Sequence, residues 1–155
     1  EPYKVAKSHL DIDSIPGHQG DARLFLLDPY DADNIIDFKR IEIPSSQLEF
    51  DYFKCLWYWY EIQARYEMFK RKYPDVKQYK MFTRDLNEYD KVKDLMDHLE
   101  IEVDEDKLRG VVGIRENLKL QRKKERISNE DSIALHKKFR ELLFANQHFN
   151  FDFDY

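Results

Sequence analysis

Two short segments carry polar residues in an order that could serve chemistry. Lys7-Ser8-His9 follows the apolar stretch Tyr3–Ala6, and Asp28–Asn34 follows the apolar run Ala22–Leu27. Both apolar stretches are predicted strands, because the buried strands of a parallel sheet are continuously apolar. Ligands of such sheets bind beyond the carboxyl ends of the strands. We therefore expect the two polar segments to line one site.

The second polar segment also has the pattern of a helix start. Asp28 can cap a helix, Pro29 suits its first position, and Asp31 stands where a capping box closes. A helix is therefore predicted from here to about Phe38. A strand, a tight turn and a helix N-terminus in succession direct backbone N–H groups toward an anion. An anion is the ligand that this segment favours.

The longest predicted helix begins after Ser46, which has the spacing of a capping box with Glu49. Large side chains repeat along it alternately four and three residues apart: Leu48, Tyr52, Cys55, Trp59, Ile62, Tyr66, Phe69 and Tyr73. Phe53, Trp57 and Tyr60 make its first half apolar on another side as well. We therefore expect this helix to be buried on more than one face.

Three shorter helices are predicted toward the C-terminus. Asn87 can cap the first, Glu88–Leu99, and Asp104 starts the second. Ser128 and Asp131 have capping-box spacing before the third. Short polar side chains mark these positions because they accept hydrogen bonds from the N–H groups of the first helical turn.

Strands alternating with helices predict the fold class. Lys77–Thr83 alternates polar and apolar residues in the manner of a third strand. The prediction is an α/β domain with a small, mostly parallel sheet flanked by helices. At 155 residues, the chain has room for one domain, residues 1–155.

Composition excludes several function classes. The chain has 11 Phe and 10 Tyr, so an ordered core is expected rather than a disordered chain. Its 26 Lys and Arg against 31 Asp and Glu give a net charge of −5, which argues against a general nucleic-acid partner. Cys55 is the single cysteine, which favours a reducing, cytoplasmic location. No apolar run approaches the roughly 20 residues that span a bilayer, so no membrane partner is expected.

Several of these segments resemble a known family. Lys7-Ser8-His9-Leu10 with the later Ile15-Pro16, and Leu24–Leu27 running into Asp28-Pro29, are similar to segments of the sulfotransferases that use 3′-phosphoadenosine 5′-phosphosulfate (PAPS). Trp57-Tyr58-Trp59 and Asp85-Leu86 are softer matches. The resemblance covers about residues 3 to 105 in order and spacing. Arg109–Asn117 looks like a two-glycine stretch of the cytosolic branch.

The resemblance implies transfer of a sulfuryl group from PAPS to a hydroxyl or amine of a small-molecule or carbohydrate acceptor. It implies that His9 is the general base, because imidazole titrates near neutral pH, and that Lys7 stabilises charge on the transferred group. It also implies contacts to the donor nucleotide from Ser8, Asn34, Arg109 and Gly110. No metal is implied.

Two departures from the family leave an alternative open. Leu27 stands where the family has a phosphate-binding arginine, and only six residues precede Lys7, so the phosphosulfate-binding loop is missing. The chain is then the carboxyl-terminal part of a longer sulfotransferase-like domain, or a non-catalytic binding domain that keeps the scaffold. In the second case its aromatic long helix packs against a partner, a missing amino-terminal half or a second copy.

Two further patterns carry little weight. Asp-x-Asp pairs such as Asp11/Asp13 and Asp31/Asp33 hold a metal and diphosphate in many transferases, but chance accounts for most pairs in so acidic a sequence. The basic run Lys119–Arg126 is predicted to be a solvated helix face rather than a phosphate contact.

Overall fold

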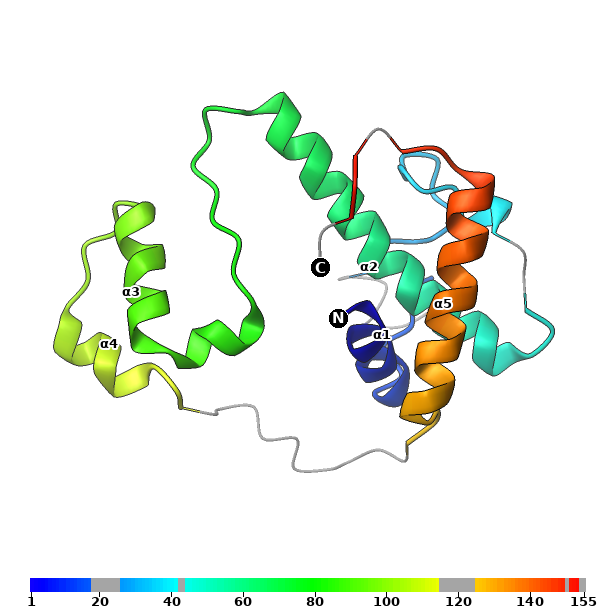
Figure 1. The fold of residues 1–155 in the computed structure, drawn as a ribbon, viewed down its shortest axis with the longest axis horizontal. Coiled ribbons are helices and arrows are strands. Elements are labelled where there is room, and N and C mark those ends of the chain that lie inside the picture. Colours follow the sequence, from blue (N-terminus) through cyan, green and yellow to red (C-terminus); the bar gives the residue numbers. More distant parts are fainter. Residues whose placement is uncertain (18–25, 42–43, 115–124, 150, 154–155) are drawn as a thin grey trace. The chain divides into compact units, whose positions relative to one another are not determined.

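The computed structural model describes residues 1–17, 26–41, 44–114, 125–149 and 151–153 (Figure 1). Within these ranges every regular element is a helix: α1 (Pro2–Asp11), η2 (Phe38–Arg40), α2 (Gln47–Lys72), η3 (Thr83–Asn87), α3 (Tyr89–His98), α4 (Glu105–Val111) and α5 (Asn129–Asn146). No strand occurs in the described ranges, so the predicted α/β fold with a parallel sheet is wrong. The sulfotransferase resemblance depends on that sheet and loses its structural basis.

The first predicted strand is part of a helix. Tyr3–Ala6 lies inside α1, whose buried residues Pro2, Ala6 and Leu10 are four apart and therefore share one face. The polar segment that was expected to follow a strand, Lys7-Ser8-His9, is the second half of the same helix. A four-residue apolar stretch was too short to separate the two periodicities.

The other predicted elements of the supposed sheet also differ. Lys77–Thr83 has no regular structure up to the start of η3. Most of Ala22–Leu27 lies outside the described residues. The predicted helix from Asp28 to about Phe38 is wrong, because residues 28–37 form turns and bends that lead into η2. The Asp28 carboxylate accepts a hydrogen bond from Tyr30 N at 2.9 Å, and the Asp28 carbonyl accepts one from Asp31 N at 3.2 Å.

The chain divides into two compact units, residues 1–69 with 122–155 and residues 70–121. The first unit has its core on α2. The fully buried large hydrophobic side chains of α2 are Tyr52, Phe53, Leu56, Trp57 and Tyr60. The Tyr52 hydroxyl lies 3.2 Å from the carbonyl of Tyr3 in α1 and 3.0 Å from that of Ser132 in α5, and so links three helices.

The predicted starts of α2 and α5 are confirmed by their capping bonds. Ser46 Oγ accepts from Glu49 N at 3.2 Å, and Ser128 Oγ accepts from Asp131 N at 3.0 Å. The predicted apolar stripe of α2 is only partly right. Tyr52 and Cys55 are fully buried, whereas four members of the stripe are 37–43% exposed: Leu48, Ile62, Phe69 and Tyr73.

The second unit contains η3, α3 and α4. The helix predicted over Glu88–Leu99 is confirmed as α3, although Glu88 rather than Asn87 occupies its N-cap. Asp104 caps α4 as predicted, with its side chain accepting from Lys107 N at 3.2 Å. Over the described part of the chain, no helix combines the length and the apolar character needed to cross a membrane.

Candidate functional site

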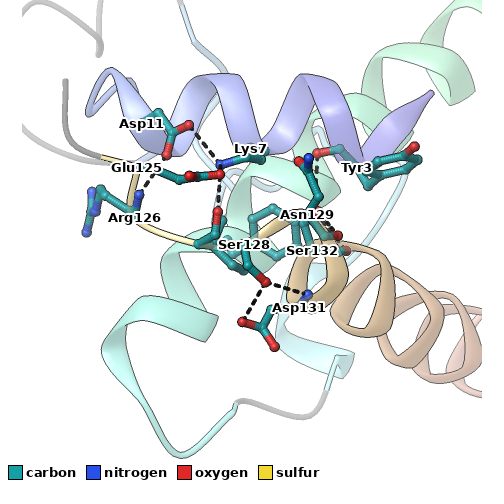
Figure 2. Close-up of polar contacts among 11 residues, drawn as sticks. Tyr3, Lys7, Asp11, Glu125, Arg126, Ser128, Asn129, Asp131 and Ser132 are labelled. Carbon is teal, nitrogen blue, oxygen red and sulfur yellow. Dashed lines mark hydrogen bonds and ion pairs between the residues drawn. The ribbon is translucent and has the colours of Figure 1, made fainter. Parts of the chain in front are cut away.

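Lys7 is a structural clamp between α1 and the segment before α5. Its Nζ donates to the carbonyl of Ile127 at 2.6 Å and to Asp11 at 3.1 Å, and forms an ion pair with Glu125 at 2.9 Å (Figure 2). The side chain is only 14% exposed. Desolvation lowers the Lys7 pKa, but hydrogen bonds to Glu125 and Asp11 outweigh it, so the pKa is raised. The Lys7 ammonium therefore stays charged and keeps its contacts with Ile127, Asp11 and Glu125.

His9 and Ser8 also lie on α1. His9 Nδ1 is 3.2 Å from the carbonyl of Ser14, and its ring packs edge-on against Tyr58 at a centroid distance of 5.6 Å. The Ser8 carbonyl accepts from Ile12 N where the helix ends. These contacts hold the end of α1 against α2 and the loop that follows.

Asn34 belongs to a polar network on the same unit that the sequence did not indicate. Its side chain donates to the Asp28 carbonyl at 2.7 Å and accepts from Arg65 at 3.1 Å. Arg65 in turn donates to Glu61 at 2.7 Å. Glu61 is completely buried in α2 and accepts the backbone N–H groups of residues 35 and 36 at 3.0 and 2.8 Å. The network fastens the turns of residues 28–36 to α2.

Arg109 and Gly110 lie in α4 of the second unit. The Arg109 guanidinium carbon is 3.8 Å from the centre of the Tyr89 ring. Tyr89 donates its hydroxyl to Glu105 at 3.1 Å. Gly110 is an ordinary helical position, where an added side-chain carbon would come within 4 Å of no described residue beyond its own helix. The six predicted site residues thus fall into three groups, on α1, on the 28–36 turns and on α4.

A hollow of about 550 Å³ lies between the N-termini of α2 and α5. Its charged lining is held by contacts within the fold. Glu125 pairs with Lys7, and Arg126 donates to Asp13 at 3.1 Å and lies 3.8 Å from the buried Asp51. The Ser128 hydroxyl donates to Asp131 at 2.9 Å. Figure 2 shows the contacts of Glu125 with Lys7 and of Ser128 with Asp131 along the segment that leads into α5.

A second hollow, of about 460 Å³, lies on the outer face of α5. It is lined by Ile133, His136, Lys137, Arg140, Glu141 and Phe144. His136 Nε2 lies 2.9 Å from the Tyr60 hydroxyl. Burial, followed by the nearby positive charge of Arg140, lowers the His136 pKa to about 4. The imidazole is therefore neutral at physiological pH.

The sequence contains a signal for this second hollow that none of the motifs captures. Ile133, Lys137, Arg140 and Phe144 recur at the spacing of one helix face in a helix whose start was correctly predicted. The hollow between the two helix starts has no such signal, because it depends on segments far apart in the chain.

Comparison with known proteins does not assign a family. No protein-family model, no curated protein and no solved structure matches this chain. Together with the helical fold of the described residues, this overturns the resemblance to PAPS-dependent sulfotransferases. Among the described residues, no group of three or more His, Cys, Asp or Glu side chains is placed to hold a metal ion.

The clamp role of Lys7 has a direct consequence for stability. We expect Lys7→Met to lower the free energy of unfolding by about 1.5–3 kcal/mol, because charged hydrogen bonds at a partly buried site are lost. Methionine keeps the apolar stem, so urea unfolding followed by circular dichroism reports mainly on the ammonium. Lys39→Met, at an exposed position of η2, is the matched control and should change stability by less than about 0.5 kcal/mol. Equal midpoints for the two variants would contradict the clamp.

Proposed function

We propose that this protein is a non-catalytic interaction domain. The observation that carries the proposal is that the residues with candidate chemistry are committed to holding the fold. Lys7 clamps the segment before α5, Asn34 belongs to the Glu61 network, and Arg109 stacks on Tyr89. A catalytic group must instead reach a reacting atom of the substrate.

Exposed apolar side chains on α5 support the same proposal. Large apolar side chains stay exposed on α5, where Ile133 is 51% and Phe144 is 42% exposed. Both line the hollow on the outer face of this helix. Apolar side chains that gather on one surface, with charged residues around them, are typical of sites that bind other proteins.

A nucleotide-binding measurement tests the proposal against enzymatic sulfuryl transfer. We expect adenosine 3′,5′-bisphosphate at millimolar concentration to leave the melting temperature unchanged. If the chain had a donor site whose Kd is one hundredth of the nucleotide concentration, binding would add about 2.7 kcal/mol to the free energy of unfolding. For a chain of this size, that raises the melting temperature by about 5–10 °C.

The matched variants for this test are Asn34→Ala and Arg109→Ala. A rise in melting temperature that one of these variants removes would place nucleotide on the predicted residues and overturn the interaction-domain proposal. A rise that neither variant changes would also count against it, because a nucleotide site would then exist elsewhere on the chain.

A further inference from the structure

We propose that the C-terminal segment after α5 is an autoinhibitory strap, which reversibly covers apolar surface on α2 and α5. The strap is formed by residues 147–149 and 151–153 of the described chain. Figure 1 shows that this segment leaves the end of α5 and turns back toward α2. The proposal rests on the interaction-domain function, because the strap covers one end of the exposed apolar surface of α5, and it specifies how that surface is regulated.

Gln147 anchors the strap at the end of α5. Its side chain is buried, its Oε1 accepts a hydrogen bond from Asp37 N at 2.9 Å, and its Nε2 donates to the Asp37 carbonyl at 3.4 Å. Its backbone N–H donates to the Leu143 carbonyl at 3.0 Å, in the last turn of α5. The strap is therefore fixed at its first residue, which serves as its hinge.

After the hinge, the strap is held mainly by contacts between aromatic rings. Over the described part of the chain, His148, Phe149, Asp152 and Phe153 form no hydrogen bond and no ion pair. The rings of Phe149, Phe151 and Phe153 lie against one another at centroid distances of 5.1–5.6 Å, and all three side chains are half-buried. A terminal segment with so few hydrogen bonds is among the first parts of a fold to open locally.

The last part of the strap covers two aromatic rings, one on each long helix. Phe153 packs edge-on against Tyr60 of α2 at a centroid distance of 5.0 Å and against Phe144 of α5 at 5.9 Å. Phe149 also contacts Phe144, at 5.9 Å. Tyr60 is fully buried with the strap closed, and Phe144 is 42% exposed. Opening the strap uncovers part of both rings, and we call this surface of Tyr60 and Phe144 the strap site.

Closure of the strap keeps other ligands from the strap site. Phe144 also lines the hollow on the outer face of α5, so a ligand in that hollow reaches the whole ring only when the strap is open. A short connection keeps the strap at an effective concentration of about millimolar at its site, and a separate ligand has to compete with it. Because the strap site holds phenylalanine rings, the ligand that fits it is a partner segment that presents phenylalanine side chains.

The test measures binding of the strap sequence, supplied as a separate peptide, to the full chain. The probe is a synthetic peptide with the sequence of residues 148–155, and binding is followed by chemical-shift changes in NMR spectra of the nitrogen-15-labelled chain. The wild-type chain is compared with the double variant Phe149→Ser/Phe153→Ser, whose strap lacks the rings that contact Tyr60 and Phe144.

We expect the peptide to bind the double variant at least about tenfold more tightly than the wild-type chain, because the strap of the variant no longer competes for the site. A tenfold difference corresponds to a wild-type strap that is closed about 90% of the time. Phe82→Ser, which replaces a 55% exposed phenylalanine of the second unit, is the matched control and should bind the peptide as weakly as the wild-type chain does.

Further substitutions locate the peptide on the double variant. Adding Phe144→Ser should weaken the peptide about fivefold, because one of the two rings of the strap site is lost. Adding Ile62→Ser, at a 39% exposed position of α2, should leave the affinity unchanged. Circular dichroism melts of each variant report whether the fold is retained.

Four outcomes overturn the strap. Absence of peptide binding to the double variant shows that the segment has no affinity for the site. Equal binding to the wild-type chain and the double variant shows that the strap does not cover the site, and an affinity that Phe144→Ser leaves unchanged places the peptide elsewhere. Loss of the folded state in the double variant shows that the segment is a fixed part of the core. Each result contradicts the strap and leaves the interaction-domain function standing, whereas nucleotide stabilisation contradicts that function itself.

Discussion

Replacing Glu61 with alanine is expected to lower the free energy of unfolding by about 3–5 kcal/mol. The carboxylate is fully buried and accepts three hydrogen bonds, from Ile35 N, Ile36 N and Arg65 Nε, at 2.7–3.0 Å. Its removal leaves two backbone donors without an acceptor and takes the buried partner from Arg65. Urea unfolding followed by far-ultraviolet circular dichroism measures the effect.

Two further variants separate the causes of that loss. Glu61→Gln keeps the shape and one acceptor oxygen but removes the charge, so we expect a smaller loss of about 1–3 kcal/mol. Glu141→Ala, on the exposed face of α5, should change stability by less than about 0.5 kcal/mol. An unfolding midpoint for Glu61→Ala that equals the midpoint for Glu141→Ala would show that the network does not hold the 28–36 turns.

Helix starts were predictable from the sequence because capping is local. Ser46, Asp104 and Ser128 each accept a hydrogen bond from a backbone N–H three residues along the chain. The side chain and its partner therefore lie within one short window of sequence. The sequence also predicts that α2 is long, since its apolar residues repeat over many turns.

The strand predictions were wrong because residues outside a short window of sequence determine the structure of both segments. Tyr3–Ala6 is too short to show a period, and the residues that fix it as helix, Pro2 and Leu10, lie outside that window on the same buried face. Lys77–Thr83 alternates as a strand does, but alternation gives a strand only where a neighbouring strand accepts its backbone hydrogen bonds. The described residues offer it no such neighbour.

The polar contacts could not be predicted because they join distant parts of the chain. Lys7 meets the Ile127 carbonyl across 120 residues, and Glu61 meets the backbone of Ile36 across 25. A lysine and a histidine two residues apart look the same in sequence whether they face a substrate or the fold itself. The tertiary structure decides between these roles, and here it places Lys7 in an internal clamp.

The burial of Trp57 also predicts a large effect. We expect Trp57→Ala to lower the free energy of unfolding by about 3–5 kcal/mol, because a fully buried indole leaves a cavity in the core. The side chain packs against Phe38 at a centroid distance of 6.1 Å. Its Nε1 donates to the Ile36 carbonyl at 2.9 Å, beside the N–H group that Glu61 accepts.

Trp57→Phe distinguishes packing from hydrogen bonding. Phenylalanine retains most of the apolar contact but leaves the Ile36 carbonyl without its donor, so a loss of about 1–3 kcal/mol is expected. Trp59→Phe, at a half-buried position two residues along the same helix, is the matched control and should cost less than Trp57→Phe. Unfolding is followed by circular dichroism rather than by tryptophan fluorescence, because each variant removes a tryptophan. If Trp57→Ala costs no more than Trp59→Phe, the core of the first unit does not depend on the packing of α2 against residues 36–38.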